Sequence, residues 1–206
     1  MAATAFSTKQ RILGAAEELF ARHGFAGASL RRVTAEAKVN LAAVNYHFGS
    51  KENLIEEVFR RRLDELNQQR MAKLAEAEAR PDATLEDVLE AFIRPALEQS
   101  TERRGGGAFV RVMARAYAEQ DERLRRFLSE NYGHVLKQFA AAFARRLPHL
   151  DKEELYWRLD IVAGALTYAM AGFGIIKRPQ QESETRYRER MTEHLVTFAA
   201  AGLRAP

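Results

Sequence analysis

The chain has 206 residues, of which 47% are hydrophobic and 29% are charged, and it contains no cysteine. This length allows one large domain, or a small domain joined to a larger one, and the charge content excludes an integral membrane protein. The lack of cysteine excludes disulfides, thiolate metal sites and cysteine nucleophiles. A reducing cytoplasm is therefore the simplest compartment.

The net charge of +4 is concentrated near the N-terminus. Residues 1–51 hold seven Lys or Arg and three Asp or Glu, so this first quarter carries the whole excess. A local basic excess is compatible with a polyanionic partner. The first twenty residues lack the charge and hydropathy order of a signal peptide, and the uncharged run 161–176 is shorter than the roughly 20 residues that cross a bilayer. We expect a cytoplasmic protein with no membrane partner.

The first eighty residues are predicted to form three short helices and one long one. Hydrophobic residues recur at helical spacing, and polar residues typical of N-caps stand before each such run. The expected caps and ends are, in chain order, Ser7 with Gln10 in a capping box, the glycine of residues 23–25, Ser29, Asn40, Gly49, Ser50 and Ala79.

The rest of the chain continues the helical pattern, without strand alternation or an internal repeat. The fold class expected is all-α with about nine helices, in which an N-terminal three-helix helix-turn-helix unit precedes a helical body. The domains expected are residues 1–52 for the N-terminal unit and 53–206 for the helical body. The five later helices are predicted over residues 84–99, 108–120, 121–147, 151–177 and 185–203.

The segment "AKVN", residues 37–40, joins two short helices by a turn that lets the second cross the first steeply. This is helix-turn-helix geometry, and the second helix can enter the roughly 12 Å wide major groove of DNA. Val39, Val44 and Phe48 are expected to anchor this helix inward, which leaves its polar and aromatic residues facing out.

The outward side chains suit nucleic-acid recognition. Asn45 can read adenine, Leu41 and Ala42 can meet a thymine methyl, and Arg31 can reach a guanine or a phosphate. Taken singly, each also has an ordinary interpretation as a packing residue, a satisfied histidine or a solvated charge. The predicted DNA-binding residues are Ser29, Arg31, Leu41, Ala42, Asn45, Tyr46, His47 and Lys51.

The stretch from Ile12 to Phe59, with its glycine-phenylalanine turn and its tyrosine-histidine-phenylalanine ending, resembles the N-terminal domain of the TetR family of transcriptional regulators. The resemblance implies a homodimer that binds a near-palindromic operator through residues 29–51. It further implies a repressor that is released by a small molecule bound in the C-terminal domain. The base-reading positions implied are Arg31, Leu41, Ala42 and Asn45, and those that contact the DNA backbone are Ser29, Tyr46, His47 and Lys51.

Three positions depart from the family pattern. Lys38 stands where the family usually has glycine in the turn, so a left-handed backbone cannot be assumed there. Asn45 stands where tyrosine is common, and Ala28 replaces a frequent threonine. The operator therefore cannot be taken from a relative.

The helical body contains a set of residues suited to an apolar effector. Aromatic and methionine side chains at helical spacing can line a pocket or simply fill the core, and the two arginines can bind a carboxylate or pair with neighbouring acids. The candidate effector-binding residues are Phe92, Phe109, Arg111, Met113, Tyr117, Phe139, Trp157, Arg158 and Tyr168. Residues 39–51 and 154–172 together resemble the PsrA-type, fatty-acid-responsive subgroup, which implies a fatty acid or acyl-CoA as the effector.

A small-residue ridge of Ala165, Ala169 and Gly172 allows a partner helix to approach closely. With residues 192–203 it can form the four-helix homodimer interface that the family resemblance implies, through the last two helices. The alternative is burial within one subunit. A dimer is favoured because half-sites one helical turn apart, roughly 34 Å, need two coupled reading heads.

No catalytic site, cofactor or metal is expected. The five histidines show no metal-ligand spacing, and "RRGGGAF", residues 103–109, lacks the lysine and strand of a phosphate loop. The alternative to a regulator is a helical interaction protein or ligand carrier without sequence-specific DNA binding. The two differ in salt dependence, because neutralising several phosphates makes DNA affinity fall steeply as salt rises.

Overall fold

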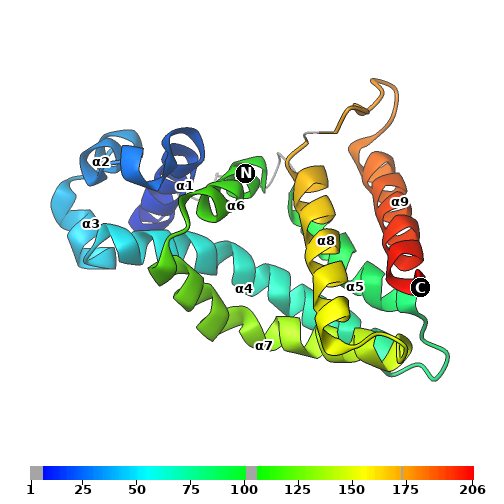
Figure 1. The fold of residues 1–206 in the computed structure, drawn as a ribbon. Helices are drawn as coiled ribbons and strands as arrows, with labels where there is room; N and C mark the ends of the chain where they lie inside the picture. The colour runs from blue at the N-terminus through cyan, green and yellow to red at the C-terminus, as the bar shows by residue number, and fades with distance from the viewer. Residues whose placement is uncertain (1–6, 101–105, 173) are drawn as a thin grey trace. The chain divides into compact units, whose positions relative to one another are not determined.

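The computed structural model describes residues 7–100, 106–172 and 174–206, apart from the side chain of Tyr117. Within these ranges the regular elements are α-helices and no strand occurs, which confirms the predicted all-α fold. None of the helices in these ranges is long and apolar enough to cross a membrane. The helices are α1 (Thr8–Gly27), α2 (Leu30–Ala37), α3 (Leu41–Phe48), α4 (Lys51–Glu78), α5 (Leu85–Gln99), α6 (Gly106–Glu119), α7 (Glu122–Arg146), α8 (Lys152–Met170) and α9 (Glu184–Arg204) (Figure 1).

The described residues form two compact units. The first unit contains the chain up to Asp64 together with Gly107–Phe127, and the second contains the described parts of Glu65–Gly106 and Leu128–Pro206. Helices α4 and α7 each contribute residues to both units. The functional boundary expected after residue 52 stays a prediction.

Helix α1 begins and breaks where the sequence predicts. The Ser7 hydroxyl accepts the backbone N–H of Gln10 at 3.2 Å, and the Gln10 side chain accepts the Ser7 N–H at 2.9 Å, which confirms the capping box. The helix is interrupted at Gly24, whose φ of 71° suits glycine. A Cβ at Gly24 would lie 2.5 Å from the Glu119 carboxylate, which accepts the N–H of Phe25 at 3.1 Å.

Contacts between aromatic rings hold the core of the first unit together. The Phe20 and Phe25 rings lie 5.5 Å apart, and Phe59 lies 6.3 Å from Phe25 and 5.6 Å from Phe109. Such pairs contribute about 0.5–1.5 kcal/mol beyond the burial of their area. They join α1, α4 and α6 around one buried cluster.

In the second unit, α5 packs against α8 and α9, which also contact each other. Leu89, Ile93 and Leu97 of α5 are fully buried. The Glu86 carboxylate, in the first turn of α5, accepts two hydrogen bonds from Arg204 of α9 at 2.5 and 2.7 Å. These hydrogen bonds lower the pKa of Glu86, so the carboxylate is favoured in its charged form.

Helix α5 begins where predicted, and its start is a second capping box. Thr84 and Asp87 exchange hydrogen bonds, with the Thr84 N–H donating to the Asp87 carboxylate at 2.7 Å. Arg80 also donates to this carboxylate, at 2.6 Å. The Thr84 N–H, followed by Arg80, lowers the pKa of Asp87 to about 2.

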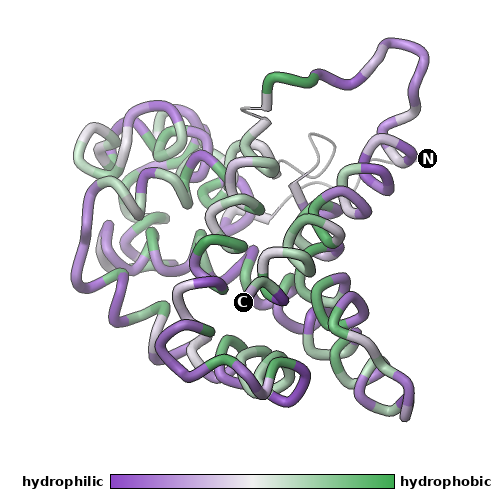
Figure 2. Tube along the Cα trace, turned by 45° about the vertical axis from the view of Figure 1, so that its right-hand side comes forward, coloured by the Kyte–Doolittle hydropathy of each residue, from purple (hydrophilic) through white to green (hydrophobic). Residues whose placement is uncertain are grey.

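Helix α8 is shorter than predicted. The expected extension to Lys177 is wrong, because the helix ends at Met170 and Gly172 adopts a φ of 67° just beyond it. Gly172 therefore does not belong to the ridge on α8. The chain then leaves as a loop with a hydrophobic stretch, visible in Figure 2, where Ile175 and Ile176 are exposed.

Candidate nucleic-acid interface

The helix-turn-helix is built from two capped eight-residue helices. The Ser29 hydroxyl accepts the N–H of Arg32 at 3.3 Å to cap α2, and the Asn40 side chain accepts the N–H of Ala43 at 2.8 Å to cap α3. Helix α1 contacts both of them. The residues buried between these helices are Val33 and Ala37 of α2 and Val44 and Phe48 of α3.

The turn between α2 and α3 has a left-handed backbone at a non-glycine residue. Lys38 has φ 53° and ψ 51°, a conformation that costs an L-residue about 1–2 kcal/mol. The N–H of Lys38 donates to the Ala35 carbonyl at 3.2 Å, and the N–H of Val39 donates to the Thr34 carbonyl at 3.0 Å. The replacement of glycine by lysine thus leaves the positive φ in place.

A side chain from α1 braces this turn. Arg11 donates from Nη2 to the carbonyls of Ala37 at 2.8 Å and Lys38 at 2.7 Å, and from Nε to Ala37 at 3.2 Å. Sequence reasoning missed this contact because its partners lie 26 and 27 residues away, with no local signal to join them.

One side of α3 faces solvent. Leu41, Ala42 and Asn45 are exposed, and the Tyr46 side chain is 85% exposed. His47 is half-buried, with its ring 5.1 Å from that of Tyr46. Since α3 is anchored through its other side, these groups are presented together on one narrow surface.

The remaining candidates flank α3 in the chain. The Ser29 hydroxyl accepts the Arg32 N–H, so its own hydrogen can be donated to a phosphate, and Arg31 is exposed on α2. Lys51 is the first residue of α4, where helix N–H groups favour an anion. The eight predicted DNA-binding residues all lie within the first unit. Their contact with DNA stays a prediction.

The side-chain amide of Asn53 binds the C-terminal end of α3. Asn53 donates from Nδ2 to the Phe48 carbonyl at 2.9 Å, and its Oδ1 accepts from Arg123 of α7 at 2.8 Å. Arg123 also donates to Glu56 at 2.9 Å. These residues were absent from the sequence prediction, and they connect α3 to the start of α7 within the first unit.

Two family models match the chain. The one described as the C-terminal domain of tetracyclin repressor-like proteins matches residues 90–202, more than half of the chain. The one described as bacterial regulatory proteins of the tetR family matches residues 12–58. The chain belongs to the TetR family. Its helix-turn-helix is thus the family's N-terminal domain, as the resemblance implied.

Individual relatives of this TetR-family chain match over short stretches only. The transcriptional repressor SCO4008 of Streptomyces coelicolor is 40% identical over 60 residues, which are 29% of this chain and 31% of the relative. The repressor AcnR of Corynebacterium glutamicum is 42% identical over 48 residues, 23% and 26% of the two chains. The matches therefore span less than a third of these relatives.

A solved structure shows the same fold along the whole chain. A TetR-like regulator from Rhodococcus sp. RHA1 superposes with a TM-score of 0.63 over 100% of both chains, at 18% identity. At this identity the likeness concerns the fold alone.

The aromatic effector candidates of this TetR-family chain fall into separate groups. Phe92 and Phe139 contact edge to face in the second unit, with ring centroids 5.1 Å apart. Phe109 is buried in the first unit against Phe59. Met113 is half-buried on α6, and the side chain of Tyr117 lies outside the described residues.

Of the two arginine candidates, Arg158 is engaged by protein groups. It donates to Glu154 at 2.6 Å, and its Nη1 donates to the carbonyls of Gly202, Leu203 and Ala205 at 3.1, 3.2 and 2.6 Å. It thus caps the last turn of α9, and binding a ligand carboxylate would require these bonds to break. Arg111 is half-exposed, 4.0 Å from Glu18.

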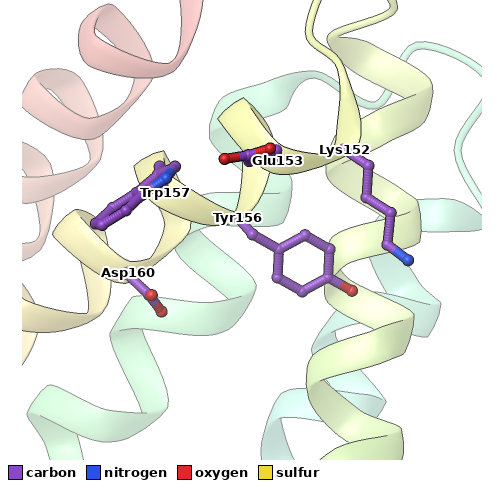
Figure 3. Close-up of a pocket in the computed structure, with 5 residues that line it drawn as sticks. All are labelled: Lys152, Glu153, Tyr156, Trp157 and Asp160. Carbon is purple, nitrogen blue, oxygen red and sulfur yellow. The ribbon is translucent and has the colours of Figure 1, made fainter.

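Trp157 and Tyr168 lie exposed on α8. Figure 3 shows the side chains of Trp157 and Tyr156 diverging from α8. Together with Lys152, Glu153 and Asp160 they line a hollow of about 410 Å³. All five of these residues belong to α8.

A second hollow in the second unit is lined by α5, α8 and α9 and has a volume of about 80 Å³. Pockets for small molecules usually measure about 300–1,000 Å³, so this space does not hold a fatty acid without opening. Among the described residues, no group of three or more His, Asp or Glu is placed to hold a metal ion.

Proposed function

We propose that this TetR-family protein is a homodimeric transcriptional repressor that binds a near-palindromic DNA operator through α3. The observation that carries the proposal is the two-sided character of α3. Val44 and Phe48 are buried, whereas Asn45 and Tyr46 project into solvent. An eight-residue helix held in this way presents donors, acceptors and apolar contacts to a major groove.

The proposed contacts follow from side-chain chemistry. Asn45 pairs with adenine, and Leu41 and Ala42 pack against a thymine methyl. Tyr46, His47, Lys51 and the Ser29 hydroxyl donate to phosphate oxygens, while Arg31 binds a phosphate or a guanine. Because residues 1–51 carry the entire net charge of +4, the reading head is drawn toward DNA before any base is contacted.

The homodimer is proposed to form through α8 and α9. Trp157 and Ile161 of α8 and Phe198 of α9 are 63%, 65% and 72% exposed, although all three are large and apolar. An apolar surface of this kind on one subunit marks a protein interface. Two copies joined there would form a four-helix interface and couple the two reading heads.

The proposed effector is a fatty acid or its acyl-CoA, which the resemblance to the PsrA-type subgroup implies. The site we favour in the second unit surrounds the Phe92 and Phe139 rings. Arg70 supports this location: it is buried, lies 3.9 Å from the Phe92 ring centroid and donates to the Phe92 carbonyl at 2.9 Å. An acyl chain would lie along these rings, and its acidic end would have to compete with the contacts that Arg70 already makes.

Release from DNA requires that the effector bind one conformation of the dimer better than the other. The shift in operator affinity can equal only this difference in effector affinity. We propose that the effector-bound dimer holds its two α3 helices at a spacing that no longer fits both half-sites.

The test is selection of DNA sites from a random pool by the purified protein, repeated with free fatty acids and acyl-CoA thioesters. An enriched palindrome that is lost on adding an acyl compound supports the repressor and its effector class. If a palindrome is enriched but acyl compounds do not change its binding, the protein is a DNA-binding regulator whose effector is not a fatty acid or an acyl-CoA. No enriched site would favour the interaction protein or ligand carrier.

A further inference from the structure

We propose that Arg11 is a positioning residue for DNA reading: without touching a base, its guanidinium holds the turn at Lys38 and so fixes the direction of α3. The inference rests on the proposed operator binding through α3. Arg11 lies on α1, outside the helices that form the helix-turn-helix, and three hydrogen bonds of 2.7–3.2 Å join it to the turn.

The carbonyls that Arg11 binds belong to the C-terminal end of α2. The last carbonyls of a helix lack partners within the helix and carry partial negative charge. Helix α2 has no basic residue in its last turn, so the cation is supplied from α1. One guanidinium reaches both Ala37 and Lys38, which a single-point ammonium group does not match.

The turn depends on an external brace because Lys38 occupies a left-handed backbone region. Glycine adopts this region without steric cost, but lysine does not. The chain therefore combines a strained residue with a side chain that binds both carbonyls flanking it. Loss of the brace would let residues 37–40 relax, and α3 would change its angle to α2.

This role differs measurably from a phosphate contact. A phosphate contact tolerates lysine in place of arginine, acts on all DNA sequences alike and contributes to the salt slope. A positioning residue must be arginine, because only a guanidinium binds both carbonyls. Its loss lowers affinity for the preferred sequence in particular, and this loss has no effect once residue 38 is glycine.

The experiment is a double-mutant cycle of Arg11→Lys and Lys38→Gly in the full chain, with Arg22→Lys as the control on the same helix. Arg22 is exposed and pairs only loosely with Glu18, at 3.7 Å. Affinities are measured over a range of salt for the selected operator and for a scrambled duplex. Hydrogen exchange of the amides of Lys38, Val39 and Ala43 reports on the turn directly.

In the wild-type background, Arg11→Lys is expected to lower the preference for operator over scrambled duplex about tenfold, because misaligned base contacts are lost. The salt slope should stay unchanged, and amide exchange at the turn should rise. With glycine at position 38, the same substitution should have little effect on either quantity. Arg22→Lys should match the wild type throughout.

The proposal is overturned if Arg11→Lys preserves both the operator preference and the exchange rates. It is also overturned if the substitution has the same effect with lysine or glycine at position 38. If the wild type selects no operator, the proposed function fails, and the exchange measurements still decide whether Arg11 holds the turn.

Discussion

The carboxylate of Glu17 in α1 accepts two hydrogen bonds from the guanidinium of Arg62 in α4, at 2.7 and 3.1 Å. Glu17 is only 3% exposed, so this ion pair is buried in the first unit. Helix α4 begins three residues after the end of α3, and the pair fixes its first half against α1. Removing Glu17 would take this partner from the Arg62 guanidinium, and breaking a buried ion pair from one side is strongly destabilising.

Glu17→Ala is therefore expected to lower the free energy of unfolding by about 3–5 kcal/mol, measured by urea denaturation. The matched control is Glu18→Ala. Glu18 is its half-exposed neighbour, whose ion pairs with Arg22 and Arg111 are 3.7 and 4.0 Å long, and its loss should cost about 1 kcal/mol or less. Equal effects of the two substitutions would contradict the assigned role of the buried pair.

Asn45→Ala and Lys51→Ala should separate base reading from phosphate binding. Loss of the Asn45 amide should cost about 1–3 kcal/mol of discrimination at one position of the operator and leave scrambled DNA unaffected. Loss of the Lys51 ammonium should weaken binding to all sequences and reduce the salt slope by about 1. Fluorescence anisotropy at several salt concentrations measures both. An unchanged operator preference in Asn45→Ala would show that this residue does not read a base.

Asn53→Ala should loosen the end of α3, because the Phe48 carbonyl loses its side-chain donor. We expect the free energy of unfolding to fall by about 1 kcal/mol and the exchange of the Gly49 amide to rise. Asn53→Asp is the informative partner, since it retains an acceptor for Arg123 but has no N–H for Phe48. If the Phe48 bond matters most, Asp and Ala will behave alike; if the Arg123 contact dominates, Asp will resemble the wild type.

Phe198→Glu should dissociate the proposed homodimer by placing a charge on the exposed face of α9. Leu136→Glu is the control, because Leu136 is also a large exposed hydrophobic residue but lies on α7. Sedimentation equilibrium should show monomers for the first variant and dimers for the second. Dimers in both would place the interface away from Phe198.

The stabilisation contributed by Asp87 should disappear in acid. Its folded-state pKa is about 2, below the usual value of 3.8, so the charged carboxylate stabilises the fold fully above about pH 5 and progressively less as the pH falls toward 2. Asp87→Asn is expected to cost about 1–2 kcal/mol at pH 7, which combines the loss of the cap and of the Arg80 ion pair. Urea denaturation at pH 7, 4 and 2.5 should show this difference shrink; a constant difference would argue against the ionised cap.

Local signals in the sequence predicted the helical fold well. The capping box at Ser7 and the caps at Ser29 and Asn40 lie where predicted, and so does the start of α5 after Thr84, because each depends on residues within one helical turn. The end of α8 was missed because the apolar run continues past the helix. The helix ends at Met170, and Gly172 adopts a left-handed backbone just beyond it, although the hydrophobic pattern itself continues.

The candidate site was predictable only where neighbours in sequence decide it. The two faces of α3 follow from its helical period, so the exposure of Asn45 and Tyr46 could be foreseen. The backbone carbonyls bound by Arg11 and Arg158 could not, because they lie 26 to 47 residues away, whereas Glu154, the partner of Arg158 one helical turn away, was among the expected alternatives. Tertiary packing decides which arginine caps a distant helix end and which remains able to bind a ligand.

The brace on the turn also bears on protein engineering. Moving residues 41–48 alone into another scaffold would transfer the proposed base-reading side chains but not the contacts that orient them. In this chain the orientation of that helix depends on Arg11, which precedes it by thirty residues. A chimera that receives α3 with its native turn therefore needs an arginine at the matching place on its first helix, or a glycine in place of Lys38.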